Sequence, residues 1–241
     1  MAARLGAEVF QLCENTGVLD IQASELASLR DQSIALGIGL ELGISGIGGQ
    51  GLERAIHVAG SLGAKIIRAV VDGGSITLQE TINKLEAILP TLEKEDLFLC
   101  VENHFRFTPD EVAYLIRTLD HRRIRVCLDP LNSLAKLVGP EETVRLLAPY
   151  AKTAHIKDVS ISRKGAGWVL VGAPLGDGQV DLRGYLSSLP QDLESLLLES
   201  WMDPLETVEA TLKQERDWVN QGMNWIRSHR TLVGHRRRKD E

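Results

Sequence analysis

The chain has 241 residues, of which 44% are hydrophobic and 25% charged, as in a globular protein with one large α/β domain or two small ones. No apolar run approaches the roughly 18 residues of a membrane span, and the first residues lack the apolar core of a signal peptide. We therefore expect no membrane partner and a cytoplasmic location. A net charge of −6 argues against a nucleic-acid partner, because neutralising phosphates requires a basic face.

Strand and helix signals alternate along the whole chain. Short apolar runs predict strands over residues 8–14, 37–45, 65–72, 97–104, 124–129, 152–159 and 193–201. Helices are predicted after them, over residues 24–36 with Ser24 as N-cap, and over 52–62, 77–93, 110–119, 141–147, 182–189 and 204–228. A Gly-containing insertion over residues 162–180 is expected to form a lid or a loop at the edge of the sheet. Strict alternation of strand and helix predicts a parallel sheet.

The fold predicted from this pattern is a (β/α)8 TIM barrel that lacks its first strand. Seven strands are one fewer than the closed parallel barrel contains. Residues 5–7 and residues 62–64 are both Leu-Gly-Ala and both precede a predicted strand, and residues 62–64 stand at the end of a predicted helix. Residues 1–5 are therefore interpreted as the end of a helix, and the strand that would precede this helix is missing. An open doubly wound sheet is the alternative. We expect a single barrel domain over residues 1–230 and a charged, disordered tail over 231–241.

Polar residues stand at the carboxyl ends of the last four predicted strands: Glu102, Asp129, His155 and Glu199. The sequence separations from Glu102 to Asp129 and from Asp129 to His155 each match the length of one βα unit. The separation from His155 to Glu199 matches one unit plus the insertion. Functional groups collect at this end of a parallel barrel. Two Glu, one Asp and one His suit one hard divalent cation, with Mn²⁺, Mg²⁺ or Co²⁺ preferred and Zn²⁺ a further candidate. The alternative is four unrelated strand-end groups, each making a hydrogen bond to a loop.

Five further residues are candidates for substrate binding: His104, Asn132, Lys157, Arg163 and Arg68. His104 and Lys157 each follow a predicted ligand by two residues, so they can face the same side of the sheet. Lys157 or Arg163 would suit an anionic substrate group. Arg68 lies within a strand, either beneath the site or in a structural ion pair. Asp158 either orients His155 or Lys157, or caps a turn.

Four motifs together resemble the xylose-isomerase-like TIM-barrel superfamily, which includes sugar phosphate isomerases and epimerases and also endonuclease IV. They are Val101-Glu102-Asn103-His104, Cys127-Leu128-Asp129-Pro130-Leu131-Asn132, His155-Ile156-Lys157-Asp158 and Leu198-Glu199-Ser200. The resemblance covers nearly the whole chain. It implies a single divalent cation held by Glu102, Asp129, His155 and Glu199, with the two glutamates as catalytic acid and base. The insertion is most similar to a branch that contains 3-oxo-isoapionate decarboxylase.

The predicted function is a metal-dependent isomerase or epimerase of carbohydrate metabolism, acting on a small sugar, sugar phosphate or sugar acid through an enediolate. The alternative is a metal-dependent lyase on the same site, which decarboxylates a 3-oxo sugar acid. A DNA-repair nuclease is disfavoured, because Asn132 stands where endonuclease IV carries an extra histidine ligand. A barrel that binds without turnover and covers its unpaired edges as a homo-oligomer is a further alternative.

Overall fold

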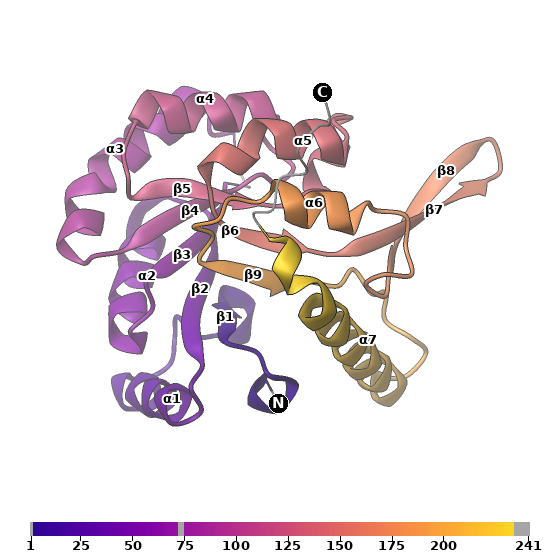
Figure 1. The fold of residues 1–241 in the computed structure, drawn as a ribbon. Helices are drawn as coiled ribbons and strands as arrows, with labels where there is room; N and C mark the ends of the chain where they lie inside the picture. The colour runs from indigo at the N-terminus through magenta and orange to yellow at the C-terminus, as the bar shows by residue number, and fades with distance from the viewer. Residues whose placement is uncertain (1, 72–74, 234–241) are drawn as a thin grey trace.

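Seven parallel strands form a nearly closed barrel in this computed structural model, which describes residues 2–71 and 75–233 (Figure 1). The strand order is β1 (Val9–Cys13), β2 (Gly39–Ser45), β3 (Ile66–Val70), β4 (Phe98–Glu102), β5 (Ile124–Leu128), β6 (Ala151–Ile156) and β9 (Ser195–Leu198). Each strand pairs in parallel with its neighbour in that order. The prediction of a TIM barrel with one strand missing is confirmed. Strands β1 and β9 are the two edges of this sheet.

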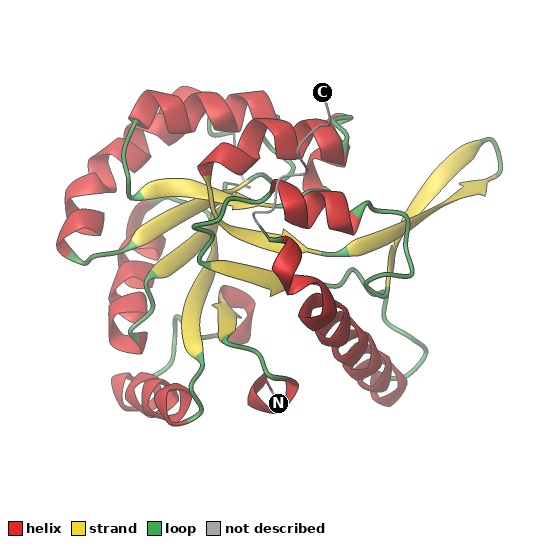
Figure 2. Cartoon of the chain, in the orientation of Figure 1, coloured by secondary structure: helices red, strands yellow, loops and turns green. Residues whose placement is uncertain are grey.

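Helices cover the outside of the barrel (Figure 2). They are α1 (Ala23–Ala35), α2 (Gly49–Leu62), α3 (Leu78–Lys94), α4 (Pro109–Leu119), α5 (Pro140–Leu147), α6 (Leu182–Ser188) and α7 (Val208–His229). Capping boxes begin α3 and α4, where Thr77 and Thr108 each accept a hydrogen bond from the backbone N–H of a glutamate three residues later. The predicted N-cap Ser24 is wrong, since Gln22 caps α1 in a capping box with Glu25.

Alternate residues of each strand face opposite sides of the barrel wall, as the period of two requires. On β4, Leu99 and Val101 pack in the main core between sheet and helices. Phe98 and Cys100 belong to a smaller cluster that also contains Cys127. Glu102 therefore shares the side of Phe98 and Cys100. Cys100 and Cys127 are buried free thiols, and burial raises the pKa of both.

The predicted insertion forms a β-hairpin, not a loop. Its strands β7 (Asp158–Lys164) and β8 (Gly167–Ala173) pair in antiparallel fashion and project from the barrel (Figure 1). The predicted strand over residues 152–159 is thereby divided between β6 and β7. β-branched and aromatic residues such as Ile161, Trp168 and Val169 favour the paired strands, and Gly165 supplies the positive φ of 61° that the turn needs.

Both ends of the described chain are short helices. Ala2–Leu5, where the end of a helix was predicted, form a 3₁₀ helix. Arg230–Leu232 form another, and Leu232 and Val233 pack against the core, so the first residues of the predicted tail are structured. Residues 234–241 lie outside the described part of the chain. Among the described residues, no helix is both long and apolar enough to cross a membrane.

Candidate metal centre

The four predicted ligands converge at the carboxyl ends of β4, β5, β6 and β9. The Nδ1 atom of His155 lies 3.5 Å from Oε1 of Glu102, 3.4 Å from Oδ2 of Asp129 and 3.1 Å from Oε2 of Glu199. Parallel pairing brings these strand ends to the same end of the barrel, because Glu102 pairs with Cys127 and Ile156 pairs with Leu198. The structure thus places the four residues around one point.

Three atoms at this point are buried and make only ion-pair contacts: Oδ2 of Asp129, Nδ1 of His155 and Oε2 of Glu199. The same three residues offer metal-ligating atoms within 4.8 Å of one another. Two carboxylate oxygens and an imidazole nitrogen are donors that suit a divalent cation. These residues therefore fit the divalent cation expected from the sequence.

Glu102 is almost fully buried and held from two sides. Its Oε1 atom accepts a hydrogen bond of 2.7 Å from Nδ2 of Asn132. Its Oε2 atom lies 3.3 Å from Nε of Arg68, which extends from the middle of β3. Gly43 on β2 leaves the room that Arg68 occupies, since a Cβ there would lie 2.9 Å from Nη2 of Arg68. Asn132 and Arg68 both contact a candidate ligand and can orient it.

Asp129 is completely buried, and its backbone and one carboxylate oxygen are fully engaged. Oδ1 accepts hydrogen bonds from the backbone N–H groups of Leu131, at 2.8 Å, and Asn132, at 2.9 Å. The side chain of Asn103 accepts from the N–H of Asp129 at 2.8 Å and donates to its carbonyl oxygen at 2.7 Å. Only Oδ2 is left to face the cluster.

Lys157 is 1% exposed and lies among the candidate ligands. Its Nζ atom is 2.7 Å from Oδ2 of Asp129 and 2.5 Å from Oε2 of Glu199, and 4.4 Å from the ring centroid of Trp201. Burial alone would raise the pKa of both carboxyl groups. The interactions of both carboxylates with Lys157 and His155 outweigh burial, so that the pKa of Asp129 is lowered and that of Glu199 falls to about 2.

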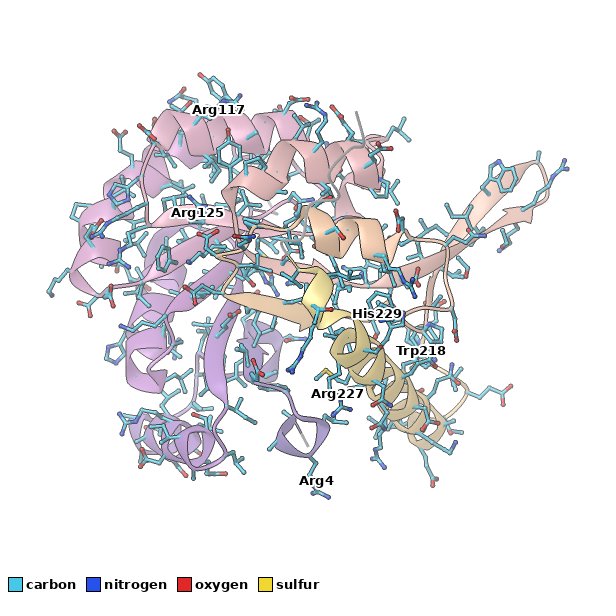
Figure 3. The ribbon with its side chains drawn as sticks, in the orientation of Figure 1. Arg4, Arg117, Arg125, Trp218, Arg227 and His229 are labelled. Atoms are coloured by element: carbon cyan, nitrogen blue, oxygen red, sulfur yellow. The ribbon has the colours of Figure 1, made fainter. Side chains whose placement is uncertain are left out.

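A cavity of about 820 Å³ lies between β1, β9 and α7 and reaches the cluster. Arg68, His155 and Glu199 line its inner end. Its outer part is lined largely by apolar side chains, among them Leu212, Val219, Met223 and Ile226 of α7. Figure 3 marks Trp218, Arg227 and His229 along α7, and Arg227 also lines the cavity. The volume is sufficient for a small sugar or sugar acid.

Comparison with known proteins identifies the family of the chain. A sequence model described as "Xylose isomerase-like TIM barrel" matches residues 1–229. The chain belongs to the xylose isomerase-like TIM barrel family. It is 29% identical over 231 residues to 3-oxo-isoapionate decarboxylase of Pectobacterium atrosepticum, covering 93% of this chain and 84% of that protein.

Solved structures of this fold agree with the barrel. D-psicose 3-epimerase, crystallised with D-fructose, superposes with a TM-score of 0.72 at 15% identity, covering 96% of this chain and 91% of that chain. The IOLI protein with a bound zinc atom superposes with a TM-score of 0.67 at 14% identity, with the same two coverages of 96% and 91%. At such identities the likeness establishes the fold.

Two predicted substrate-binding residues, His104 and Arg163, differ in their surroundings. His104 follows β4, is half-buried, and has its ring 3.9 Å from that of Phe105. Arg163 is exposed on the outer part of the hairpin, where its Nε donates to the carbonyl oxygen of Gly165 at 3.2 Å. The prediction treated the segment that carries Arg163 as a loop, but β7 extends it outward. The structure therefore does not bring Arg163 to the cluster.

Asp158 organises the loop that follows the hairpin. Its carboxylate accepts hydrogen bonds from the backbone N–H groups of Gly176, at 3.0 Å, Gly178, at 3.0 Å, and Val180, at 3.2 Å. Glycine is required at position 178, because a Cβ there would lie only 2.1 Å from Oδ1 of Asp158. Of the two sequence interpretations of Asp158, the structure supports the turn-capping one.

The variant Asp158→Ala is expected to lower the free energy of unfolding by about 3 kcal/mol, because these three backbone N–H groups and that of Val159 lose a charged acceptor. Urea denaturation followed by circular dichroism measures the change. Asp181→Ala is the matched control, since Asp181 caps α6 with a single hydrogen bond to Gly184, and its loss is expected to cost about 1 kcal/mol. Equal effects of the two variants would contradict the role assigned to Asp158.

Sequence reasoning missed contacts that support the ligands from outside the strand ends. The hydroxyl of Tyr185, on α6, donates to the carbonyl oxygens of His155, at 2.8 Å, and Leu128, at 3.2 Å. Nothing in the sequence around Tyr185 indicated this contact, since the residue reads as an ordinary buried helix position. Asn103, by contrast, directly follows Glu102 in its motif, and this position could have indicated a role beside the ligands.

Proposed function

We propose that this chain is a metal-dependent enzyme acting on a small sugar acid through an enolate, with decarboxylation of a 3-oxo sugar acid as the leading candidate reaction. The observation that carries the proposal is the convergence of Glu102, Asp129, His155 and Glu199 at the inner end of a cavity of about 820 Å³. We further propose that residues 1–230 act as one barrel domain and that the partner is a small molecule.

The proposed cofactor is one divalent cation, with Mn²⁺, Mg²⁺ or Co²⁺ preferred over Zn²⁺ for a donor set of three carboxylates and one imidazole. The zinc atom bound by the IOLI protein supports a divalent cation in this fold. When bound, such a cation would supply electrophilic stabilisation of the negative charge that develops on a ketone oxygen. Glu102, Asp129, His155 and Glu199 would hold it.

The sequence relative favours decarboxylation over epimerisation. A two-base epimerase needs both glutamates to exchange protons with the substrate. Loss of CO₂ needs only one proton-moving group, and the sequence relative at 29% identity is itself a decarboxylase.

In the proposed reaction the bond between the carboxylate carbon and C2 of a 3-oxo acid breaks. Its electron pair forms the C2–C3 enolate as CO₂ leaves, and a proton then adds to C2. Arg68 lines the inner end of the cavity, and we assign it to hold the substrate carboxylate. Glu102, oriented by Asn132 and Arg68, is the group we assign to relay the proton.

The second candidate is the isomerase or epimerase predicted from the sequence. It is favoured by the approach of two glutamates from different strands to the same imidazole, Glu102 on β4 and Glu199 after β9. In that reaction one glutamate would remove a proton from the carbon beside the ketone, and the other would return a proton on the opposite face.

Product analysis distinguishes the two candidates. The Mn²⁺-loaded protein is incubated in D₂O with a 3-oxo sugar acid and, separately, with a panel of ketoses. We expect CO₂ release from the acid and one solvent deuteron at the carbon that lost it. Epimerisation of a ketose without CO₂ release would favour the second candidate. Turnover that persists after chelation and dialysis would contradict a metal-dependent reaction of either kind.

A further inference from the structure

Each carboxylate of the candidate metal centre already has a cation of the chain beside it. Arg68 lies 3.3 Å from Glu102. Lys157 lies 2.7 Å from Asp129 and 2.5 Å from Glu199, and is one of the largest fully buried side chains among the described residues. Lysine is rarely buried so completely. The position of its ammonium group between two candidate ligands calls for a physical role.

We propose that Lys157 is a resident counter-cation of the metal centre: it holds Asp129 and Glu199 in place before a metal binds, and it limits how tightly the metal is held. This inference rests on the proposed function, because it assumes that the cluster binds a divalent cation. Lys157 is then a positioning residue, and the metal affinity depends on Lys157 as well as on the four ligands.

The ability of Lys157 to hold Asp129 and Glu199 in place follows from its charge. Carboxylates that converge without a cation repel one another, and a buried ion that loses its partner is strongly destabilising. The contacts of Lys157 with Asp129 and Glu199 offset this repulsion. The ligands therefore keep their arrangement in the metal-free state, and this state is stabilised relative to the metal complex.

The limit that Lys157 places on metal affinity follows from the same contacts. A divalent cation bound by Asp129, His155 and Glu199 would place two further positive charges within a few ångströms of the ammonium group. Like charges repel more strongly in a buried site than in water. The face of the Trp201 ring, 4.4 Å from Nζ, gives the ammonium group a partner that does not compete with the metal. Lys157 can thus remain charged in both states while weakening the metal complex.

Substrate binding explains the position of Lys157 less well. Its side chain is 1% exposed. The residues that line the cavity at this end are Arg68, His155 and Glu199, and Lys157 is absent from the lining. An anion would have to displace a carboxylate of the chain to reach the ammonium group.

The test compares Mn²⁺ binding by isothermal titration calorimetry in the wild type, Lys157→Met and Lys157→Gln. Both variants remove the charge, and glutamine keeps a hydrogen-bond donor. We expect each variant to bind Mn²⁺ more than about tenfold tighter than the wild type, because the repulsion is removed and the metal-free state is raised in energy. We also expect both to unfold at lower temperature than the wild type in EDTA, with Mn²⁺ restoring most of the difference.

Lys152→Met is the matched control. Lys152 lies on the same strand, pairs with Glu194 at 2.8 Å and faces the Phe98 ring at 5.2 Å, but it stands at the opposite end of β6 from the cluster. Its replacement is expected to leave Mn²⁺ affinity unchanged.

The outcomes separate the inference from the proposed function. A wild type that binds no Mn²⁺ would overturn both. A wild type that binds Mn²⁺, with Lys157 variants that bind equally or more weakly, would overturn the inference alone. Variants that fold only in the presence of Mn²⁺ would support it, since the metal then replaces the missing cation. Variants that fold neither with nor without Mn²⁺ would overturn it, because Lys157 would then have a structural role that a metal cannot replace.

Discussion

Replacement of Glu102 by glutamine is expected to lower turnover of the metal-loaded protein by about 10²- to 10⁴-fold, the range that a positioned proton-transfer group contributes. Glutamine has nearly the same shape, so the side chain still fits beside Asn132 and Arg68. It cannot relay a proton as a carboxylate does, and it is a weaker ligand for a divalent cation. We expect lower steady-state turnover and a weaker Mn²⁺ affinity by calorimetry. The thermal unfolding midpoint is expected to show that the fold is retained.

The control for this variant is Glu41→Gln. Glu41 is also buried inside the barrel, where its Oε2 atom accepts a hydrogen bond of 3.1 Å from Gln11, and burial raises its pKa. A neutral glutamine is therefore well tolerated there, and turnover is expected to stay close to that of the wild type. Turnover of Glu102→Gln at the wild-type level would remove Glu102 from the proposed mechanism.

Asp129→Ala is expected to lower the free energy of unfolding in EDTA by about 3–5 kcal/mol, the usual effect of removing one partner of a buried ion pair. Lys157 loses one of its two carboxylates, and the N–H groups of Leu131 and Asn132 lose their acceptor. Urea denaturation measures the change. Mn²⁺ binding is expected to fall sharply, and with it the rise in unfolding midpoint that a bound ligand produces.

Asp129→Asn separates the two contributions to this effect. Asparagine keeps an oxygen that can accept from the N–H groups of Leu131 and Asn132 but removes the negative charge beside Lys157. We expect a smaller loss of stability than for alanine and an equally severe loss of Mn²⁺ binding. An alanine variant as stable as the wild type would contradict the buried ion pair, and unchanged Mn²⁺ binding in both variants would exclude Asp129 as a ligand.

Much of the barrel could be predicted from the sequence because its signals are local. Each strand is a short apolar run, and helices such as α3 and α4 begin at a capping residue, Thr77 and Thr108. Parallel pairing then brings equivalent strand ends to one edge. This is why Glu102 and Asp129, spaced by one βα unit, meet His155 and Glu199 in the structure.

The partners of the remaining polar residues were decided only by the tertiary structure. Lys157 was predicted as a substrate-binding residue, and its burial between Asp129 and Glu199 became visible only in the tertiary structure. Arg163 was expected near the site, but pairing of β7 with β8 carries it outward on a hairpin. These outcomes depend on contacts between segments far apart in the chain, and on competition among several available carboxylates and backbone groups. Local sequence periodicity therefore predicts which residues stand at a strand end, whereas the fold determines which charges meet there.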